Sequence, residues 1–192
     1  MPNHPKSSAK NEQGEYESFP AMDLNQLAQH MPAVKKKYLL HRDFSGVTMK
    51  KFLEDMGNRD MTVLNCNTTT SVWIENKGNG KFEMHPLPVE AQFAPVNAIL
   101  AADLDGDGNM DLLLGGNEYQ TEVSTGRYDA SYGLMLKGNG RGSFVPVKPK
   151  ASGLILDGDV KNIRMIKTGT GQEFLLTAVN NDSLECFRIN KN

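Results

Sequence analysis

The chain has 192 residues, a formal net charge of −2 and a hydrophobic content of 39%, values typical of one globular domain or a piece of a larger one. This charge argues against a nucleic-acid partner, and we interpret the only basic run, Lys35-Lys-Lys, as a solvated helix face. No apolar stretch is long enough for a membrane span, and the first residues lack the apolar segment of a signal peptide.

The amino-terminal third predicts little regular structure. Residues 1–20 are polar and show no periodicity, which predicts a flexible segment without visible chemistry. Residues 21–60 predict a short helical segment. Asp23 is placed to cap a helix that ends at about Met31, and Thr48 to cap a second helix that ends at about Met56. Helical spacing predicts that four side chains of the second helix face a core: Met49, Phe52, Leu53 and Met56.

Residues 61–192 have the features of strands and hairpins, with an internal repeat of about 60 residues. The run Trp73–Phe82 resembles Met135–Phe144, and each contains an Asn-Gly turn that supplies the positive φ of a tight hairpin. Two further matches follow in the same order: Val96–Ile99 with Val160–Ile163, and Asp111–Leu114 with Glu173–Leu176. Three to four strands per unit predict a mainly β, partial β-propeller of about two blades, over residues 61–125 and 126–192.

A candidate metal loop occupies residues 103–111, Asp-Leu-Asp-Gly-Asp-Gly-Asn-Met-Asp. Four carboxylates and one main-chain carbonyl fall at alternate positions, and Ca²⁺ prefers such oxygen ligands. The candidate ligands are Asp103, Asp105, Asp107, Asn109 (through its carbonyl) and Asp111. Gly106 and Gly108 allow the backbone to turn tightly between them. We therefore predict one calcium site, with a solvated acidic turn as the alternative.

The flanks of this loop distinguish it from an EF-hand. An EF-hand needs a bidentate Glu at position 12 and a helix on either side, whereas position 12 is Leu114 and both flanking runs are short, apolar and strand-like. The matching stretch of the second repeat, residues 166–173, offers one carboxylate. The sequence thus predicts a calcium loop between strands, in the first repeat alone.

We find no pattern for catalysis. The sequence lacks a nucleophile elbow, and its histidines share no spacing: His4, His30, His41 and His85. Cys66 and Cys186 lie in strand-like runs, where a small buried residue is common, although a disulfide between them stays open. The glycine-rich stretches 106–108 and 138–142 precede no helix, so they lack the features of a phosphate loop. We predict that the chain is not an enzyme.

The segment between Asn117 and Gly133 carries more polar and aromatic residues than a strand connection needs. Its candidate ligand surface, for a glycan or a protein, consists of Arg127, Tyr128, Asp129 and Tyr132. The alternative is a loop that packs over the neighbouring blade, since Tyr and Arg also serve that purpose.

The pattern Asp-x-Asp-x-Asp-Gly-x-x-Asp between strands, with Asn-x-Gly-x-Gly-x-Phe hairpins, resembles FG-GAP or VCBS repeats. The runs 27–38 and 126–133 resemble the carboxy-terminal part of bacterial VCBS proteins similar to cartilage acidic protein, and the likeness covers about residues 15–192. The resemblance implies a calcium-stabilised β-propeller module in an exported protein, periplasmic, secreted or at the cell surface. It also implies that further blades complete the propeller, because closure needs at least four.

Three functions remain open at this point. The chain is a calcium-binding recognition or adhesion module, a structural fragment in which calcium only stiffens one blade, or, as the least favoured alternative, a calcium-dependent hydrolase acting on glycans. Open blades expose unpaired strand edges, so self-association is a further expectation.

Overall fold

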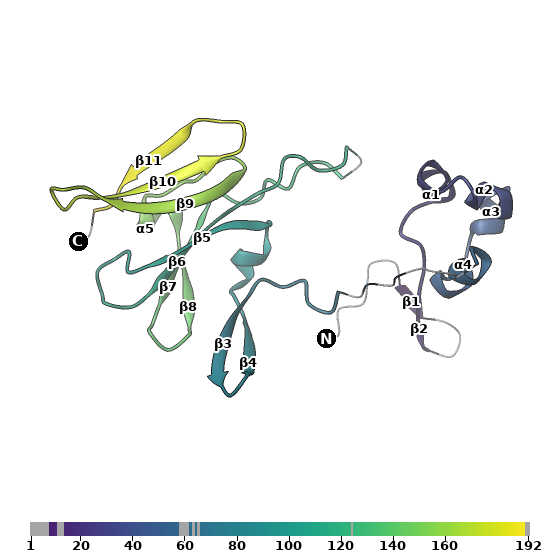
Figure 1. Ribbon diagram of the computed structural model, residues 1–192, viewed down its shortest axis with the longest axis horizontal. Coiled ribbons are helices and arrows are strands. Elements are labelled where there is room, and N and C mark those ends of the chain that lie inside the picture. The colour runs from purple at the N-terminus through teal and green to yellow at the C-terminus, as the bar shows by residue number, and fades with distance from the viewer. Residues whose placement is uncertain are drawn as a thin grey trace. The chain divides into compact units, whose positions relative to one another are not determined.

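The computed structural model describes residues 8–10, 14–57, 62, 64, 66–123 and 125–190. The chain divides into two compact units, residues 1–68 and 69–192, and each is described by itself (Figure 1). None of the helices in the described residues has the length and apolar character of a membrane span.

The described residues of the first unit form a small hairpin and four short helices. Their bounds are β1 (Ser8–Lys10), β2 (Tyr16–Ser18), α1 (Leu24–His30), α2 (Val34–Lys37), α3 (His41–Phe44) and α4 (Met49–Asp55). Strands β1 and β2 pair antiparallel, whereas the sequence predicts a flexible segment over residues 1–20. Two strands of three residues are too short to show a periodic pattern. Residues 1–7 and 11–13 of that predicted segment lie outside the described residues.

Both predicted helix caps are confirmed. The Asp23 carboxylate accepts from the backbone N–H groups of Asn25 and Gln26 at 2.8 and 2.9 Å, and the Gln26 side chain accepts from the Asp23 N–H at 3.0 Å. The Thr48 hydroxyl accepts from the Lys51 N–H at 3.2 Å. Helices α2 and α3 have four residues each and were not predicted, since one turn carries no periodicity.

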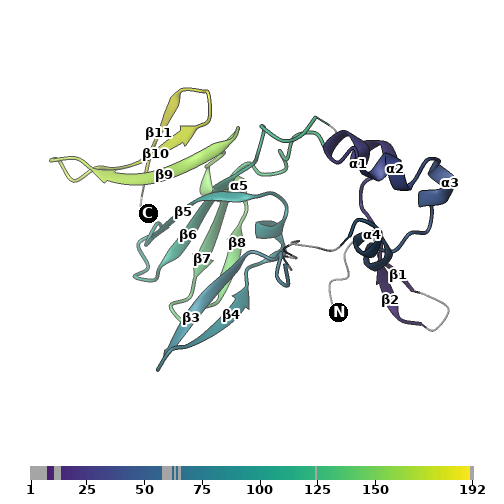
Figure 2. The ribbon, with the colours of Figure 1, turned by 45° about the vertical axis from the view of Figure 1, so that its right-hand side comes forward.

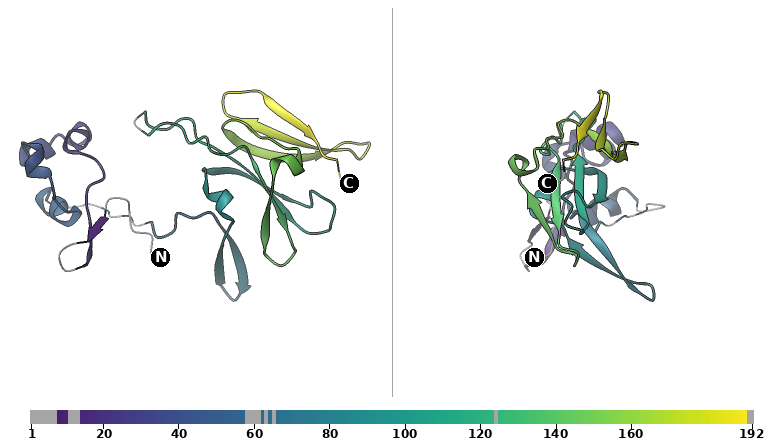
Figure 3. Two further views of the ribbon diagram at one scale, coloured as in Figure 1. Left: turned by 180° about the vertical axis from the view of Figure 1, so that it is seen from behind. Right: turned by 90° about the vertical axis from the view of Figure 1, so that its left-hand side faces the viewer.

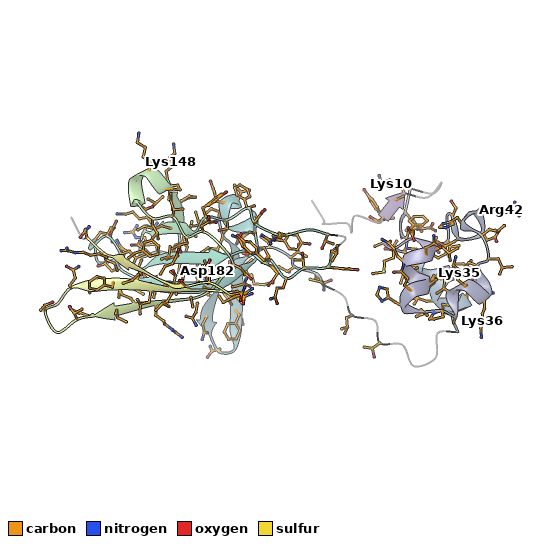
Figure 4. The ribbon with its side chains drawn as sticks, turned by 90° about the horizontal axis from the view of Figure 1, so that it is seen from above. Lys10, Lys35, Lys36, Arg42, Lys148 and Asp182 are labelled. Carbon is orange, nitrogen blue, oxygen red and sulfur yellow. The ribbon has the colours of Figure 1, made fainter. Side chains whose placement is uncertain are left out.

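These helices enclose a small apolar core. Its buried members are Leu24, Val34, Tyr38 and Phe52, and Met49, Leu53 and Met56 pack against them, as predicted. The Tyr38 hydroxyl donates to Asp55 at 2.6 Å, and burial together with this bond raises the pKa of Tyr38 to about 12. Lys35 and Lys36, labelled in Figure 4, are both exposed, which fits the predicted solvated face.

The second unit is built from antiparallel sheets, and none of them is closed. They are the hairpin β3 (Val72–Gly78) and β4 (Lys81–Pro86), the four-stranded sheet β5 (Val96–Ala102), β6 (Asp111–Gly116), β7 (Leu134–Gly138) and β8 (Phe144–Val147), and the three-stranded sheet β9 (Val160–Lys167), β10 (Glu173–Val179) and β11 (Leu184–Arg188). A 3₁₀ helix, η1 (Val89–Gln92), and helix α5 (Pro149–Ser152) lie between strands. The mainly β, partial β-propeller-like fold is confirmed.

The sheets and the sequence repeat have different phases. The repeat places the hairpin 73–82 ahead of β5 and β6 in one unit, but β3 and β4 pair with each other, while β6 pairs with β7 (Figure 2). Sequence similarity gives the length of a repeat but not the residue at which one sheet ends and the next begins. The last strand of one sequence repeat can pair with the first strand of the next, as β6 does with β7. The complete blade therefore runs from β5 to β8.

Strand β6 is buried on both faces, which explains its continuous apolar run. Leu113 packs into a core with Leu156, Val160 and Ile163, at the side of β9 and β10. Leu114 points the other way, into a second core with Ala91 and Leu136. Seen from behind, β5 runs beside β9 at the junction of the two larger sheets (Figure 3). The alternation of leucines along β6 thus packs one face of the central sheet against β9 and β10 and the other against η1.

The expected burial of the two cysteines is wrong. Cys66 and Cys186 are both exposed. Cys186 lies on the outward row of β11, a strand at the edge of its sheet, and Cys66 lies in no described strand. The face of β11 on which Cys186 lies decides its exposure, because Glu185 and Phe187, on the other face of the same strand, are half-buried.

Candidate metal centre

The acidic loop connects β5 to β6 at one end of the central sheet, and both predicted flanking strands are confirmed. Gly106 and Gly108 each have a φ of +85°, a backbone conformation that side chains with a Cβ rarely adopt. The two turns bring alternate carboxylates to one side of the loop. The spacing seen in the sequence is thereby converted into convergence in space.

Three of the predicted ligands come together. Asp103, Asp105 and Asp111 each offer a carboxylate oxygen, and these atoms all lie within 4.8 Å of one another. Asp107 is outside this group. The main-chain carbonyl of Asn109 stays a prediction, and its side-chain oxygen lies against Gly140, where an added Cβ would approach it to 2.4 Å.

Backbone donors hold all three carboxylates in place, since Asp105 also accepts from the Asp107 N–H at 3.1 Å. Asp111 is fully buried, and its oxygens accept from the N–H groups of Leu104 at 3.0 Å and Gly138 at 2.9 Å. Asp103 accepts from Gly106 at 2.7 Å and from Gly108 at 3.1 Å. These bonds leave lone pairs for a cation, because a carboxylate has about four acceptor sites. The Gly138 bond also ties the loop to β7.

Lys137, which the sequence analysis missed, supplies the nearest positive charge. Its ammonium group contacts Asp105 and lies 2.9 Å from Asp107 Oδ2. Hydrogen bonds to Asp105 and Asp107 raise the pKa of Lys137, and the hydrogen bond from Lys137 lowers the pKa of Asp107. Lys137 follows Asp105 by 32 residues, so only the pairing of β6 with β7 brings the two groups together.

The donor set fits a hard divalent cation. Three converging carboxylates of which one is fully buried repel one another, and oxygen ligands without nitrogen or sulfur suit Ca²⁺ better than a transition metal. The position of the Lys137 ammonium shows that the loop attracts positive charge.

Comparison with known families identifies part of the chain. The FG-GAP-like repeat family matches residues 57–114, a range that holds strands β3 to β5, the whole acidic loop and the first four residues of β6. Residues 57–114 form an FG-GAP-like repeat. Such repeats are non-catalytic, build β-propeller-type modules and are typical of extracellular proteins. Neither the curated proteins nor the solved structures contain a match to the chain.

A second convergent group in the described residues lies on the hairpin β3–β4 and was not predicted. Glu75 and Glu83 face each other across the strands, and His85 Nε2 lies 3.1 Å from Glu75 Oε2. Lys77 bridges the two glutamates at 2.9 and 3.3 Å, and the His85 ring stacks on Trp73. Lys77 thus supplies positive charge to both glutamates of this group.

The candidate ligand surface between β6 and β7 is exposed at every predicted position: Arg127, Tyr128, Asp129 and Tyr132. Glu118 and Tyr128 exchange backbone hydrogen bonds of 2.9 and 3.0 Å, so the segment folds back on itself. The Arg127 guanidinium lies 4.8 Å from the centre of the Tyr119 ring. This pairing is cation–π in type and presents an aromatic and cationic surface to solvent.

The base of the same segment is fixed by Asn117, another residue that the sequence analysis missed. Asn117 is 1% exposed, has a φ of +79°, and donates through its amide to the carbonyls of Ser131 at 2.7 Å and Gly158 at 2.9 Å. Lys161 adds ion pairs to Glu118 at 2.8 Å and to buried Asp159 at 2.7 Å. The base of the segment is therefore joined to β9, while the residues of the candidate ligand surface are exposed to solvent.

Proposed function

We propose that this chain is a non-enzymatic, calcium-stabilised β-propeller module that serves recognition or adhesion in an exported protein. The observation that carries the proposal is the convergence of Asp103, Asp105 and Asp111 in a loop that contacts both β6 and β7. The FG-GAP-like repeat supports the propeller and an extracellular setting. The narrower resemblance to bacterial VCBS proteins stays a prediction.

The residues of the loop define how calcium would act on stability. Asp103 and Asp105 project from the loop, while Asp111 belongs to β6 and is bonded to the backbone of Gly138 in β7. Bound calcium supplies positive charge that offsets the repulsion among these carboxylates. Because the unfolded chain does not hold the carboxylates together, calcium binds the folded state preferentially and raises the free energy of unfolding by mass action.

A thermal melt tests this role directly. Purified protein in chelator is compared with protein in CaCl₂ and in MgCl₂, which tests ion size. At a hundredfold excess of calcium over its dissociation constant the expected gain is about 2.7 kcal/mol, and Asp105→Ala and Asp107→Ala should remove most of it. An unchanged melting temperature in calcium would reject the calcium site.

The recognition role rests on the exposed surface of Arg127, Tyr128, Asp129 and Tyr132. Its test is a screen for glycan and protein binding by wild type and by the double variant Arg127→Ala/Tyr128→Ala. The control is the double variant Lys148→Ala/Lys150→Ala, which changes two other exposed residues. Loss of binding without a lower melting temperature in the first pair alone supports recognition. A lower melting temperature with no ligand found favours the structural role.

The structural role has an observation of its own. Asn117 and Lys161 connect the base of the segment to the start of β9, as the packing alternative expects. In that case the acidic loop and the segment 117–133 both serve to join consecutive sheets. The hydrolase alternative has no such support, since the family is non-catalytic.

We further propose that the open sheets associate with a second copy. In the described residues no strand pairs with the outer edges of β3, β8 or β11. Ile74, Phe82 and Met84 share one face of the hairpin and are 58, 66 and 59% exposed. Unpaired edges beside apolar side chains favour association. Light scattering after size exclusion should give a mass above 21.2 kDa; a monomer at all concentrations rejects this part.

A further inference from the structure

We propose that Lys137 is a built-in counter-ion that competes with calcium for the acidic loop and so sets the calcium concentration at which the loop fills. The inference rests on the proposed calcium site. Lys137 would then help to set the affinity of the loop for calcium. Without calcium, its ammonium would neutralise part of the negative charge of the aspartates.

The contacts show that the lysine and a cation would use the same carboxylate. Asp105 is one of the three convergent residues, and its Oδ2 contacts the Lys137 ammonium. Asp107, a predicted ligand, directs its Oδ2 to the same ammonium at 2.9 Å instead of to the convergent group. All four loop aspartates thus accept backbone N–H groups, and two of them, Asp105 and Asp107, also contact Lys137.

Simultaneous occupancy is unfavourable for an electrostatic reason. A divalent ion among Asp103, Asp105 and Asp111 would lie within a few ångströms of the ammonium, and like charges at such distances repel strongly near a protein surface. The carboxylate of Asp107 must also turn from Lys137 before it can contribute an oxygen to the ion. Calcium binding therefore requires the ammonium to leave.

The structure provides room for that movement. A cavity of about 650 Å³ lies between the four-stranded and three-stranded sheets, and both Asp105 and Lys137 line it. Its wall also includes Leu113, Met135 and Phe187, which suit the methylene stem of a lysine. The Lys137 side chain is 46% exposed, so it is not locked in place by packing.

A lysine at this position is not required by the hairpin. The register pairs Asn76 with Phe82 in one hairpin and Gly138 with Phe144 in the other, so Glu75 occupies the place that corresponds to Lys137. The equivalent strand thus accepts the opposite charge. The positive charge occurs on the strand that lies beside the acidic loop, which indicates a role toward that loop.

Isothermal titration with CaCl₂ tests the proposal on four proteins: wild type, Lys137→Met, Lys137→Arg and Lys167→Met. Lys137→Met keeps the stem and removes the charge, Lys137→Arg keeps the charge, and Lys167→Met removes an exposed lysine elsewhere in the same unit. We expect Lys137→Met to bind calcium about tenfold more tightly than wild type, while the other two variants stay within about twofold.

A second measurement separates competition from simple destabilisation. In chelator, Lys137→Met should melt below wild type, because the loop has lost its counter-ion; in excess calcium the order should reverse or the gap should close. Tight binding by Lys137→Met beside weak or absent binding by wild type supports the proposal most strongly. Equal or weaker binding by Lys137→Met overturns it alone, and no binding by either protein overturns the calcium site together with it.

Discussion

Two connections at equivalent places in neighbouring sheets solve the same problem with different chemistry. The β5–β6 connection carries three aspartates, a fourth begins β6, and Lys137, a residue of another strand, supplies positive charge. The β9–β10 connection is neutral between Lys167 and Glu173 and closes on itself, because Thr168 N–H donates to the Gln172 carbonyl and Gly171 N–H donates to the Thr168 carbonyl, both at 2.9 Å. A strand connection therefore needs no ion, and the charge of the first connection points to a use beyond turning the chain.

The largest expected change in the free energy of unfolding concerns the first residue of the strand that follows each connection. Asp111→Ala should lower the free energy of unfolding by about 3 kcal/mol, because it leaves the Leu104 and Gly138 N–H groups buried without an acceptor. Glu173→Ala, at the start of β10, is the control, with a side chain 19% exposed. Urea denaturation measures both changes, and losses of equal size would remove the contrast between the two connections.

A smaller effect is expected where each pair of strands ends. Asn117→Ala removes three side-chain hydrogen bonds to Ser131 and Gly158, so it should cost about 2 kcal/mol. Asn180 occupies the comparable place after β10, and its side-chain amide donates to Asp159 at 3.1 Å. Asn180→Ala should cost about 1 kcal/mol. A greater loss for Asn180→Ala in the same urea titration contradicts the expectation.

The stability of the neutral β9–β10 connection should depend on the Thr168 hydroxyl group and not on calcium. Thr168→Val removes the bond from Gln172 N–H to Thr168 Oγ1 at 3.2 Å, and the expected loss is about 1 kcal/mol. The rise in melting temperature on addition of CaCl₂ should be the same in Thr168→Val and wild type. A variant that loses the calcium response would show that the second connection also takes part in binding.

The smallest expected effect on stability concerns Asp55, a carboxylate that is paired with lysines of the chain itself, as Asp105 and Asp107 of the β5–β6 connection are. Asp55 contacts Lys51 at 2.7 Å and Lys37 at 3.2 Å, and bonds from Lys51 and Tyr38 hold its pKa well below the usual range. A lowered pKa gives stability that is present above about pH 4 and is lost as the pH falls through the folded pKa. Asp55→Asn should melt a few degrees lower at pH 7, and the difference should shrink at pH 2.

Chelator and calcium should leave this difference unchanged, since Asp55 lies in the other unit. Melting curves at pH 7, 4 and 2 provide the measurement. A difference that grows as the pH falls would contradict the assigned direction of the pKa shift.

The sequence by itself determined what depends on neighbouring residues. Caps at Asp23 and Thr48, the strands beside the acidic loop and the tight turns at Gly106 and Gly108 follow from local backbone chemistry, and the structure has them where they were predicted. The spacing of the aspartates likewise predicted a shared face, and three of them converge.

The tertiary structure decided what depends on which strands pair. Only the pairing of β6 with β7 brings Lys137 to Asp105 and the Gly138 N–H to Asp111. Only the packing of one face of β11 leaves Cys186, on the other face, exposed, and only the approach of β9 makes Asn117 an anchor. Contacts between residues distant in the chain cannot be predicted from local spacing, because the local sequence around each partner is compatible with its strand or turn whether or not the contact forms.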